Sequence, residues 1–238
     1  MPDQLRATAP PKLKVVTIDG PSGVGKSTIS RKVAAELGYT YLDTGAMYRA
    51  VAYSCGKAGI DAEDADQQTN LHSLLAALAV QLLPPVQEGN EVRVLLAGED
   101  ISGAIRTPEM SMTASKVSAV PAVRTRLTAM QQDMGKAGKL VVEGRDTGTI
   151  VFPDAAWKFY LDATPEERCR RRVEQLRERS QQVNEQDILA QIIQRDRNDQ
   201  ERAIAPLIMA EDAVLVDSSC LSVNEVVARM LEIIRQQG

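Results

Sequence analysis

The chain has 238 residues, of which 44% are hydrophobic and 25% are charged, a composition typical of globular proteins. This length suffices for one sizeable α/β domain with insertions or for two small domains. The net charge of −4 at pH 7 gives no bulk attraction to nucleic acid or to an anionic membrane. No apolar run is long enough to span a bilayer, so we expect neither a nucleic-acid nor a membrane partner.

The first predicted strand, Val15–Ile18, runs into the stretch IDGPSGVGKST at residues 18–28. This stretch matches the pattern G-x-x-x-x-G-K-[ST], and a helical pattern, Lys26–Leu37, follows it. Glycines let successive backbone N–H groups form an anion-binding nest, and the helix N-terminus favours negative charge. Lys26 can reach the β- and γ-phosphates, and the Ser27 hydroxyl can meet a magnesium ion. A glycine-rich turn with a chance lysine is the alternative, but the strand–loop–helix setting favours a nucleoside triphosphate site.

Beyond this loop, short β-rich runs alternate with helical patterns, which predicts a parallel sheet with right-handed crossovers. The predicted strands are Val15–Ile18, Thr40–Asp43, Leu140–Glu143, Lys158–Asp162 and Val214–Asp217. They end at polar residues, namely Asp19, Asp43, Glu143, Asp162 and Asp217. Ligands bind at the carboxyl ends of the strands in open α/β sheets. This edge is therefore the expected site, although we interpret Asp162 and Asp217 as plain turn residues.

Two segments interrupt the alternation. The stretch VQLLPPVQEGNEVRVLLAGED predicts two antiparallel strands around an EGN turn, the first with prolines suited to an edge. We interpret it as part of an insertion at residues 67–101. The polar stretch RERSQQVNEQD predicts a mobile loop at residues 179–186. We expect a single domain over residues 1–238, whose core comprises residues 13–66, 102–178 and 187–238.

Two short motifs follow predicted strands. In LDTGAMYRA, Asp43 and Thr44 can cap a helix that carries Arg49 one turn further on, and a plain capped helix is the alternative to a binding role. In VVEGRDTGTIVFPDA, Arg145 and Asp146 come directly after a central strand. Such charges are costly if buried without a function, which favours a site. A structural Arg–Asp pair remains the alternative.

The helix predicted in EQDILAQIIQRDRNDQERAIAP combines an apolar stripe with a charged face. The stripe consists of Ile188, Leu189, Ile192 and Ile193. Arg195, Asp199 and Arg202 fall at i, i+4 and i+7 and share one face. Arginine donates bidentately to phosphate, and aspartate can accept from ribose hydroxyls, so this face suits a sugar phosphate. A solvated face of ion pairs is the alternative.

The segment EERCRRRVEQLRER carries a run of arginines next to the predicted loop. The interleaved glutamates offset much of that charge, which favours a lid that closes on a polyphosphate over nucleic-acid binding. The single histidine, His72, is expected on a helix surface, and no histidine-centred metal site or triad is expected. The three cysteines lack metal-ligand spacing and predict reduced thiols in a cytoplasmic protein. The first eleven residues lack an apolar h-region, so we expect no signal peptide.

Taken together, these motifs resemble those of the bacterial cytidylate kinases, enzymes that phosphorylate CMP and dCMP. The resemblance runs from Val15 to the C-terminal helix, and EGRDTGTIVFPDA is its most specific part. The other stretches that carry it are IDGPSGVGKST, YLDTGAMYRA, GEDISGAIRTPEMSMTASKVSAVPAVR and RDRNDQERAIAPL. It implies the P-loop nucleoside monophosphate kinase fold: an α/β fold with a five-stranded parallel sheet, flanking helices, a three-stranded antiparallel insert in the NMP-binding region and a short lid. It also implies a monomer that transfers the γ-phosphoryl group of ATP to CMP or dCMP with Mg²⁺.

The resemblance further implies roles for single residues. ATP would lie on Gly20, Pro21, Ser22, Gly23, Val24, Gly25, Lys26, Ser27 and Thr28, with Arg168 and Arg172 closing over it from the lid. CMP would be held by Thr44, Arg49, Ser115, Arg124, Asp146, Arg195, Asp199 and Arg202. Within this set, Ser115 and Asp146 would read the cytosine, and Arg195 and Asp199 would hold the sugar. Arg124, Arg145 and Arg202 would surround the monophosphate and the transferring phosphoryl group, and the implied catalytic set adds Lys26 and Arg172.

Three other functions fit the motifs less well. Another P-loop kinase with a small acceptor, such as a UMP/CMP, shikimate or dephospho-coenzyme A kinase, is disfavoured by the insert and by EGRDTGT. A GTPase switch would need an N-K-x-D-like guanine reader, which the sequence lacks. A nucleic-acid-binding ATPase conflicts with the acidic charge balance.

Overall fold

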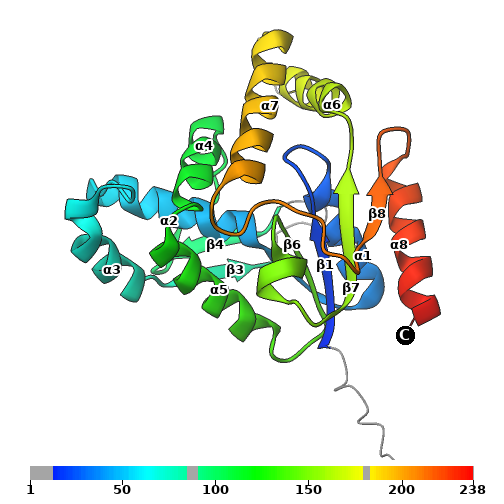
Figure 1. The fold of residues 1–238 in the computed structure, drawn as a ribbon, viewed down its shortest axis with the longest axis horizontal. Helices are drawn as coiled ribbons and strands as arrows, with labels where there is room; N and C mark the ends of the chain where they lie inside the picture. Colours follow the sequence, from blue (N-terminus) through cyan, green and yellow to red (C-terminus); the bar gives the residue numbers. More distant parts are fainter. Residues whose placement is uncertain (1–12, 85–90, 179–182, 238) are drawn as a thin grey trace, which may run out of the picture.

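Five strands pair in parallel to form a central sheet in the order β2-β6-β1-β7-β8 (Figure 1). The computed structural model describes residues 13–84, 91–178 and 183–237. The strands are β1 (Leu13–Asp19), β2 (Thr40–Asp43), β6 (Leu140–Gly144), β7 (Ala155–Asp162) and β8 (Val214–Asp217). The five predicted strands are therefore confirmed, and the largest difference is that β7 begins at Ala155 rather than Lys158.

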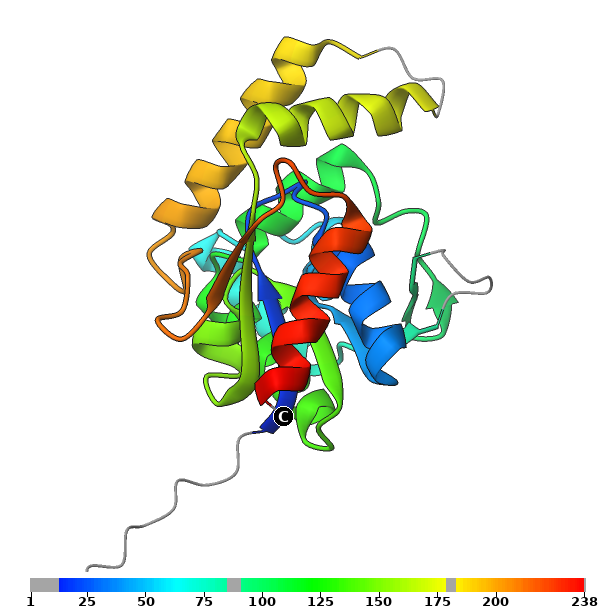
Figure 2. The same cartoon turned by 90° about the vertical axis from the view of Figure 1, so that its right-hand side faces the viewer.

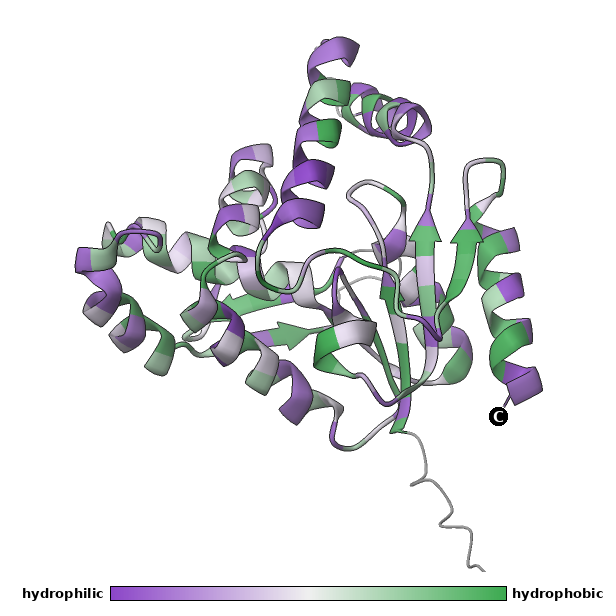
Figure 3. Ribbon diagram, viewed as in Figure 1, coloured by the Kyte–Doolittle hydropathy of each residue, from purple (hydrophilic) through white to green (hydrophobic). Residues whose placement is uncertain are grey.

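Helices cover both faces of this sheet. They are α1 (Lys26–Leu37), α2 (Thr44–Ala58), α5 (Pro121–Gly135) and α8 (Val223–Gln237). On the face of α1 and α8, Val16 and Ile18 of β1 join the apolar cluster, whereas Val15 joins the cluster of α2 and α5 (Figures 1 and 2). Successive side chains of a strand point to opposite faces, so strands covered on both faces have near-continuous apolar runs. The strands accordingly contain much green in Figure 3.

The insertion between α2 and α5 has its own small sheet. Its elements are η1 (Ala65–Gln67), α3 (Gln68–Ala76), β3 (Val80–Leu83), β4 (Arg93–Leu96) and β5 (Glu99–Asp100), and α4 (Pro108–Val117) follows. β3 and β4 pair antiparallel, with Val80 opposite Leu96, which confirms the predicted hairpin. Its EGN turn falls within residues 85–90, outside the described residues. β5 adds a third strand beside β4, as the resemblance implied.

Helices α6 (Pro165–Glu178) and α7 (Glu185–Glu201) lie together above the carboxyl edge of the sheet (Figure 1). Their surfaces are largely hydrophilic (Figure 3), and a small apolar cluster around Val173 and Ile192 joins them. Two predictions were wrong here. Of the loop predicted at residues 179–186, residues 179–182 lie outside the described residues. Residues 185–186 begin α7, because Asn184 caps the helix by accepting from the N–H of Gln186. Ile193, assigned to the apolar stripe, is 43% exposed because the packed face of α7 is narrower than the stripe.

Three smaller predictions can also be checked. His72 is exposed on α3, and its Nδ1 lies 2.6 Å from the carbonyl oxygen of Gln68. The cysteines at positions 55, 169 and 220 are free thiols. Asp162 and Asp217 accept from backbone N–H groups one and two residues ahead, as turn residues do. Within residues 13–84, 91–178 and 183–237, no helix is both long and apolar enough to cross a bilayer.

Candidate functional site

The loop between β1 and α1 has the strand–loop–helix setting that its motif requires. It passes so close to β7 that a Cβ on Gly20 would lie 2.0 Å from the carbonyl oxygen of Leu161, so only glycine fits. Lys26 opens α1, is buried, and donates from Nζ to the carbonyl oxygens of Gly20 (2.7 Å) and Pro21 (2.6 Å). Burial, and after it the charge of Arg145, lowers the pKa of Lys26 well below its usual value. An anion bound at this loop would therefore stabilise the charged lysine.

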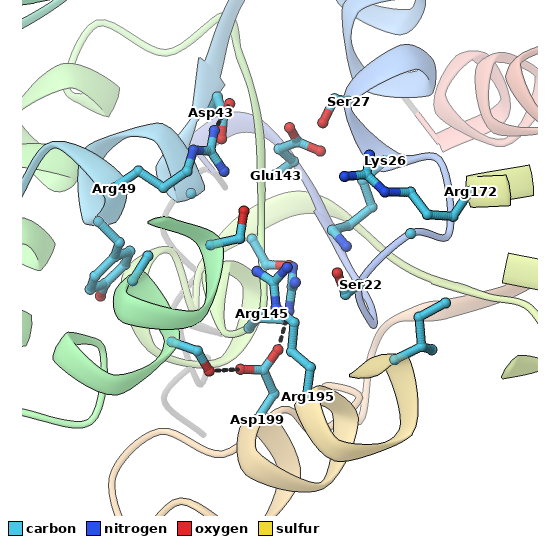
Figure 4. Close-up of a pocket in the computed structure, with 18 of the residues that line it drawn as sticks. Ser22, Lys26, Ser27, Asp43, Arg49, Glu143, Arg145, Arg172, Arg195 and Asp199 are labelled. Carbon is cyan, nitrogen blue, oxygen red and sulfur yellow. Dashed lines mark hydrogen bonds and ion pairs between the residues drawn. The ribbon is translucent and has the colours of Figure 1, made fainter. Parts of the chain in front are cut away.

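A cleft of about 400 Å³ extends from this loop between α2, α4, α6 and α7 (Figure 4). The predicted site residues that line it are Ser22, Gly23, Gly25, Lys26, Ser27, Thr28, Thr44, Arg49, Ser115, Arg145, Asp146, Arg172, Arg195, Asp199 and Arg202. Those outside the lining are Gly20, Pro21, Val24, Arg124 and Arg168. Residues expected for ATP and residues expected for CMP, from segments far apart in the sequence, thus meet around one cleft.

The EGRDTGT motif begins in β6 and continues past its end. Asp19, the last residue of β1, binds the part of the motif that follows the strand. The Asp19 carboxylate accepts from the N–H of Thr147 (2.9 Å), from the Thr147 hydroxyl (2.8 Å) and from the N–H of Gly148 (2.7 Å). A Cβ on Gly148 would lie 2.8 Å from Oγ1 of Thr17, so the segment packs this closely only with glycine. The chain then turns into the short helix η2 (Thr147–Val151), and Arg145 and Asp146 are left at the cleft wall.

Asp146 is a buried carboxylate between two arginines. It forms an ion pair with Arg124, and Nη2 of Arg202 lies 3.6 Å from its Oδ1. Arg124 is fixed in turn by donating to the carbonyl oxygen of Ser118 (3.1 Å). Burial raises the pKa of Asp146 although Arg124 and Arg202 oppose it. Arg145 and Asp146 do not pair with each other: Asp146 pairs with Arg124 of α5, and Arg145 pairs with Asp199 of α7. The alternative of a structural pair between these two neighbours is therefore wrong.

Arg145 instead pairs with Asp199 on α7. Nε of Arg145 donates to Oδ2 of Asp199 over 2.8 Å, and the Ser115 hydroxyl donates to Oδ1 over 3.2 Å (Figure 4). Arg195 reaches the same wall, and burial followed by the charge of Arg145 lowers its pKa to about 10. Its Nε is buried without a partner in the described part of the chain. Arg202 lies just past the end of α7, yet it still lines the cleft with Arg195 and Asp199.

The N-terminus of α2 supplies the opposite wall. Asp43 caps the helix as predicted, by accepting from the N–H of Ala46 (2.9 Å), and pairs with Arg49 over 3.0 Å. The Thr44 hydroxyl donates to the carbonyl oxygen of Glu143 over 2.7 Å. Nε of Arg49 is buried and has no partner among the described residues. A buried donor of this kind is normally satisfied, which makes Arg49 a candidate to contact a ligand.

Glu143 is the penultimate residue of β6 and lies beside the phosphate-binding loop, where an ATP-bound metal ion would be expected. It is 4% exposed; Oε1 accepts the Tyr41 hydroxyl over 2.5 Å, and Oε2 has no partner among the described residues. The Ser27 hydroxyl and the Glu143 carboxylate face each other in Figure 4. Burial raises the pKa of Glu143, with Asp43 adding to the rise and Lys26 opposing it. Mg²⁺ prefers oxygen ligands, retains several waters and is held through one or two carboxylates plus substrate phosphates, so these residues fit it.

Comparison with known proteins assigns the chain to a family. The family model described as Cytidylate kinase matches residues 16–236. The chain belongs to the cytidylate kinase family. Cytidylate kinases from Syntrophotalea carbinolica and Pasteurella multocida are 45% and 46% identical to it, covering 94% and 93% of this chain and 92% and 95% of theirs. The solved structure of an uncharacterized protein from Eubacterium ventriosum covers 94% of this chain and 99% of that one at 13% identity, with a TM-score of 0.51, which shows a shared fold.

Family membership confirms two predictions made from the motifs. The fold is the P-loop nucleoside monophosphate kinase fold, with its five-stranded parallel sheet and three-stranded insert. The enzyme class is a kinase, a phosphotransferase. Family membership does not assign roles to individual side chains, which differ in their contacts around the cleft.

The arginines of α6 differ in what they can do in this cytidylate kinase family member. Arg168 is 3% exposed and donates to the carbonyl oxygens of Ala163 (2.9 Å) and Ser22 (3.0 Å), and it pairs with Asp196 of α7 over 2.6 Å. These contacts hold the Arg168 side chain against the phosphate-binding loop, outside the lining of the cleft. Arg168 therefore stabilises the conformation of the loop. Arg172, by contrast, lines the cleft (Figure 4).

Sequence reasoning missed several residues of this cytidylate kinase site. Glu143 was noted only as a strand end, although its carboxylate lies beside Lys26 and Ser27. Tyr48 packs its ring 5.7 Å from the Arg124 guanidinium carbon and lines the cleft. The Ser118 hydroxyl accepts from Nη1 of Arg202 over 3.1 Å. Tyr48 follows Thr44 on one turn of helix and could have been found by helical spacing, whereas Glu143 and Ser118 depend on contacts between distant segments.

Proposed function

We propose that this cytidylate kinase family member transfers the γ-phosphoryl group of ATP to CMP or dCMP, giving ADP and CDP or dCDP. The observation that carries the proposal is the single cleft in which a phosphate-binding loop meets a buried carboxylate flanked by arginines. The loop suits a triphosphate. A carboxylate among arginines suits a base with an amino donor that is joined to a phosphate.

On the donor side, residues 20–28 hold the phosphates of ATP through backbone N–H groups and the N-terminus of α1. Lys26 leaves the carbonyl oxygens of Gly20 and Pro21, its partners here, for the β- and γ-phosphates. Arg172 reaches the transferring group from α6. Arg168 acts indirectly, because its contact with the carbonyl oxygen of Ser22 shapes the loop.

On the acceptor side, Asp146 and Ser115 read the cytosine, since a carboxylate accepts from the N4 amino group. Arg124, Arg145 and Arg202 surround the phosphate of CMP and the phosphoryl group in transit. Thr44 and Arg49 hold the acceptor from α2, and Arg195 and Asp199 hold the sugar from α7. Nε of Arg49, Nε of Arg195 and Nη2 of Arg202 are buried without a hydrogen-bond partner among the described residues, and all three arginines line the cleft, so they are donors that such an anion can satisfy.

Magnesium completes the donor complex. We propose that the Ser27 hydroxyl and the Glu143 carboxylate would hold it, because the two side chains face each other at the cleft. When bound with ATP, Mg²⁺ supplies positive charge that offsets the charge of the phosphates. The acceptor phosphate is already an anion, so the residues need no strong general base. Catalysis then rests on positioning and on charge neutralisation by Lys26 and the arginines.

Three further properties belong to the same proposal. Residues 67–101 serve as the NMP-binding insert, the segment that joins α6 to α7 serves as the lid, and the remaining parts serve as one core. Closure of α6 and α7 over the cleft would exclude water that otherwise hydrolyses ATP. We also propose that the enzyme acts as a monomer in the cytoplasm.

An ADP-release assay with ATP, Mg²⁺ and a panel of acceptors tests the function. We expect rapid ADP release with CMP and dCMP, much less with UMP, and little with AMP or GMP. Product identity should be checked by ³¹P NMR, which separates transfer to CMP from hydrolysis of ATP. Release of ADP that is independent of the acceptor, or a preference for a purine monophosphate, would reject the proposal.

A further inference from the structure

Tyr41 and Glu143 form a contact that no proposed step yet uses. Tyr41 lies on β2 and Glu143 on β6, in adjacent parallel strands in which Asp43 pairs with Glu143. Side chains two residues apart in a strand share a face. Tyr41 and Val141 both belong to the apolar cluster under α1. Glu143 follows Val141 on that face, so its carboxylate comes to lie under the first turn of α1, where Ser27 stands.

The two carboxylate oxygens of Glu143 differ in their surroundings. Oε1 accepts the Tyr41 hydroxyl over 2.5 Å, whereas Oε2 is buried and accepts no hydrogen bond of good geometry in the described part of the chain. The Ser27 hydroxyl lies close enough to the carboxylate to oppose the rise in its pKa. An unpartnered oxygen on a side chain that is 4% exposed is costly unless something binds it. The Ser27 side of the carboxylate opens into the cleft (Figure 4). A metal-bound water in that position would satisfy Oε2.

The tyrosine hydroxyl restricts which way the carboxylate can turn. Glutamate has several rotatable bonds, and the ammonium group of Lys26 is close enough to influence the charge of Glu143. A glutamate without a second partner could turn toward Lys26 and neutralise it. The Tyr41 hydroxyl carries one proton and donates it to Oε1, which fixes the carboxylate in its orientation beside Ser27.

We propose that Tyr41 is a positioning residue for the nucleotide-bound magnesium: its hydroxyl holds Glu143 so that Oε2 accepts from a water on the metal beside Ser27. The inference rests on the proposed binding of Mg·ATP at residues 20–28, and it deepens that proposal by adding a residue outside the loop. Tyr41 touches neither nucleotide nor metal. Its effect should therefore appear in the coupling between metal and nucleotide rather than in the affinity for the nucleotide alone.

The coupling can be measured by calorimetric titration of ATP without an acceptor. The dissociation constant is determined once with EDTA and once with saturating Mg²⁺, and the ratio of the two constants is the coupling. For Tyr41→Phe, which keeps the ring, we expect an unchanged constant in EDTA and a coupling about three- to tenfold below that of the wild type, the range for one lost hydrogen bond. Tyr39→Phe, which removes the same atom two residues earlier, should retain the wild-type coupling.

A second background shows whether Tyr41 acts through Glu143. Glu143→Gln should lower the coupling by itself, and adding Tyr41→Phe to it should lower the coupling no further. An unchanged coupling in Tyr41→Phe, or an equal loss with and without Glu143→Gln, would overturn the inference. Equal weakening of ATP binding with and without metal would also overturn it, because that is the result of a purely structural tyrosine. These titrations contain no acceptor, so their outcome does not depend on the ADP-release assay with the panel of acceptors. The proposed function is therefore tested separately.

Discussion

Arg145 and Asp199 join the central sheet to α7 through one 2.8 Å contact between Nε and Oδ2. Asp199 is 4% exposed, and its second oxygen accepts from Ser115 on α4. Three separate elements therefore meet at one carboxylate. Because breaking a buried ion pair leaves a charge without its partner, Asp199→Asn should lower the free energy of unfolding at pH 7 by about 3 kcal/mol.

The effect of Asp199→Asn should depend on pH. Burial alone would raise the pKa of Asp199, but Arg145 and Arg195 outweigh it and lower that pKa below its usual value. A carboxyl whose folded pKa is lowered stabilises the fold above its unfolded pKa of about 3.9, and this contribution is lost as the pH falls through the folded value. Urea unfolding of both proteins should give a constant difference between pH 7 and about pH 5 and a shrinking one below about pH 4. A difference that persists unchanged at the lowest pH would contradict this account of Asp199.

Lys26→Ala removes the buried loop lysine that we propose binds the phosphates of ATP. Turnover should fall by at least about a hundredfold, because the developing charge loses a preorganised partner. Steady-state ADP release measures the loss, and circular dichroism checks that the fold survives. Lys57→Ala, at an exposed position of α2, serves as the control and should retain wild-type turnover. Near-normal activity in a folded Lys26→Ala variant would remove the loop lysine from the mechanism.

Arg202→Ala should separate use of CMP from use of ATP. Its guanidinium lies 3.6 Å from Asp146 and contacts the Ser118 hydroxyl, on the acceptor side of the cleft. Loss of one charged contact costs about 1.5–3 kcal/mol, which is about a ten- to 150-fold loss in kcat/KM for CMP, while the KM for ATP stays close to that of the wild type. Arg197→Ala, at an exposed position of α7, is the control. Equal losses for both substrates would place Arg202 in the fold rather than at the acceptor.

Arg168 and Arg172 lie on the same helix, α6, but should respond differently to substitution. Arg168→Ala should lower stability and weaken ATP binding together, because Asp196 and the carbonyl oxygen of Ser22 lose their buried partner. Arg172→Ala should reduce turnover, because its side chain lines the cleft. Differential scanning fluorimetry and ATP titration on both variants distinguish these outcomes. If Arg168→Ala kept full stability and lost only turnover, Arg168 would belong with the lid arginines as first predicted.

The sequence predicted most of the sheet because parallel strands buried on both faces leave continuous apolar runs. The runs before Asp19, Asp43, Glu143, Asp162 and Asp217 each became a strand. The short strand β5 pairs only through Glu99 and Asp100, both exposed. It has no apolar pattern of its own and was expected only from the resemblance to a family.

The site was less predictable because its contacts cross between elements. The consecutive arginines in α6 do not indicate which of them contacts the loop. Arg168 does so in the structure, where it also pairs with Asp196 of α7. The chemistry of Glu143 depends on Tyr41 from the neighbouring strand. Asp146 and Arg145 are neighbours in the chain, yet their partners, Arg124 and Asp199, come from two different helices. Local spacing cannot specify such pairs.

We propose that the buried carboxylate of Asp146 selects cytosine. Cytosine presents an N4 amino donor to it, whereas uracil presents an O4 acceptor that faces the lone pairs of the carboxylate. A buried site built for a donor rejects an acceptor strongly, because polar groups are left unpaired. Asp146→Asn offers an amide donor instead, so it should weaken the use of CMP and bring it closer to that of UMP.

The alternative role for Asp146 is to orient Arg124 and Arg202. In that case Asp146→Asn would slow all acceptors by a common factor. The decisive measurement is kcat/KM for CMP and for UMP on the wild type and on Asp146→Asn. Our account predicts a ratio of CMP to UMP that is high in the wild type and clearly lower in the variant; an equal ratio in the two proteins would contradict it.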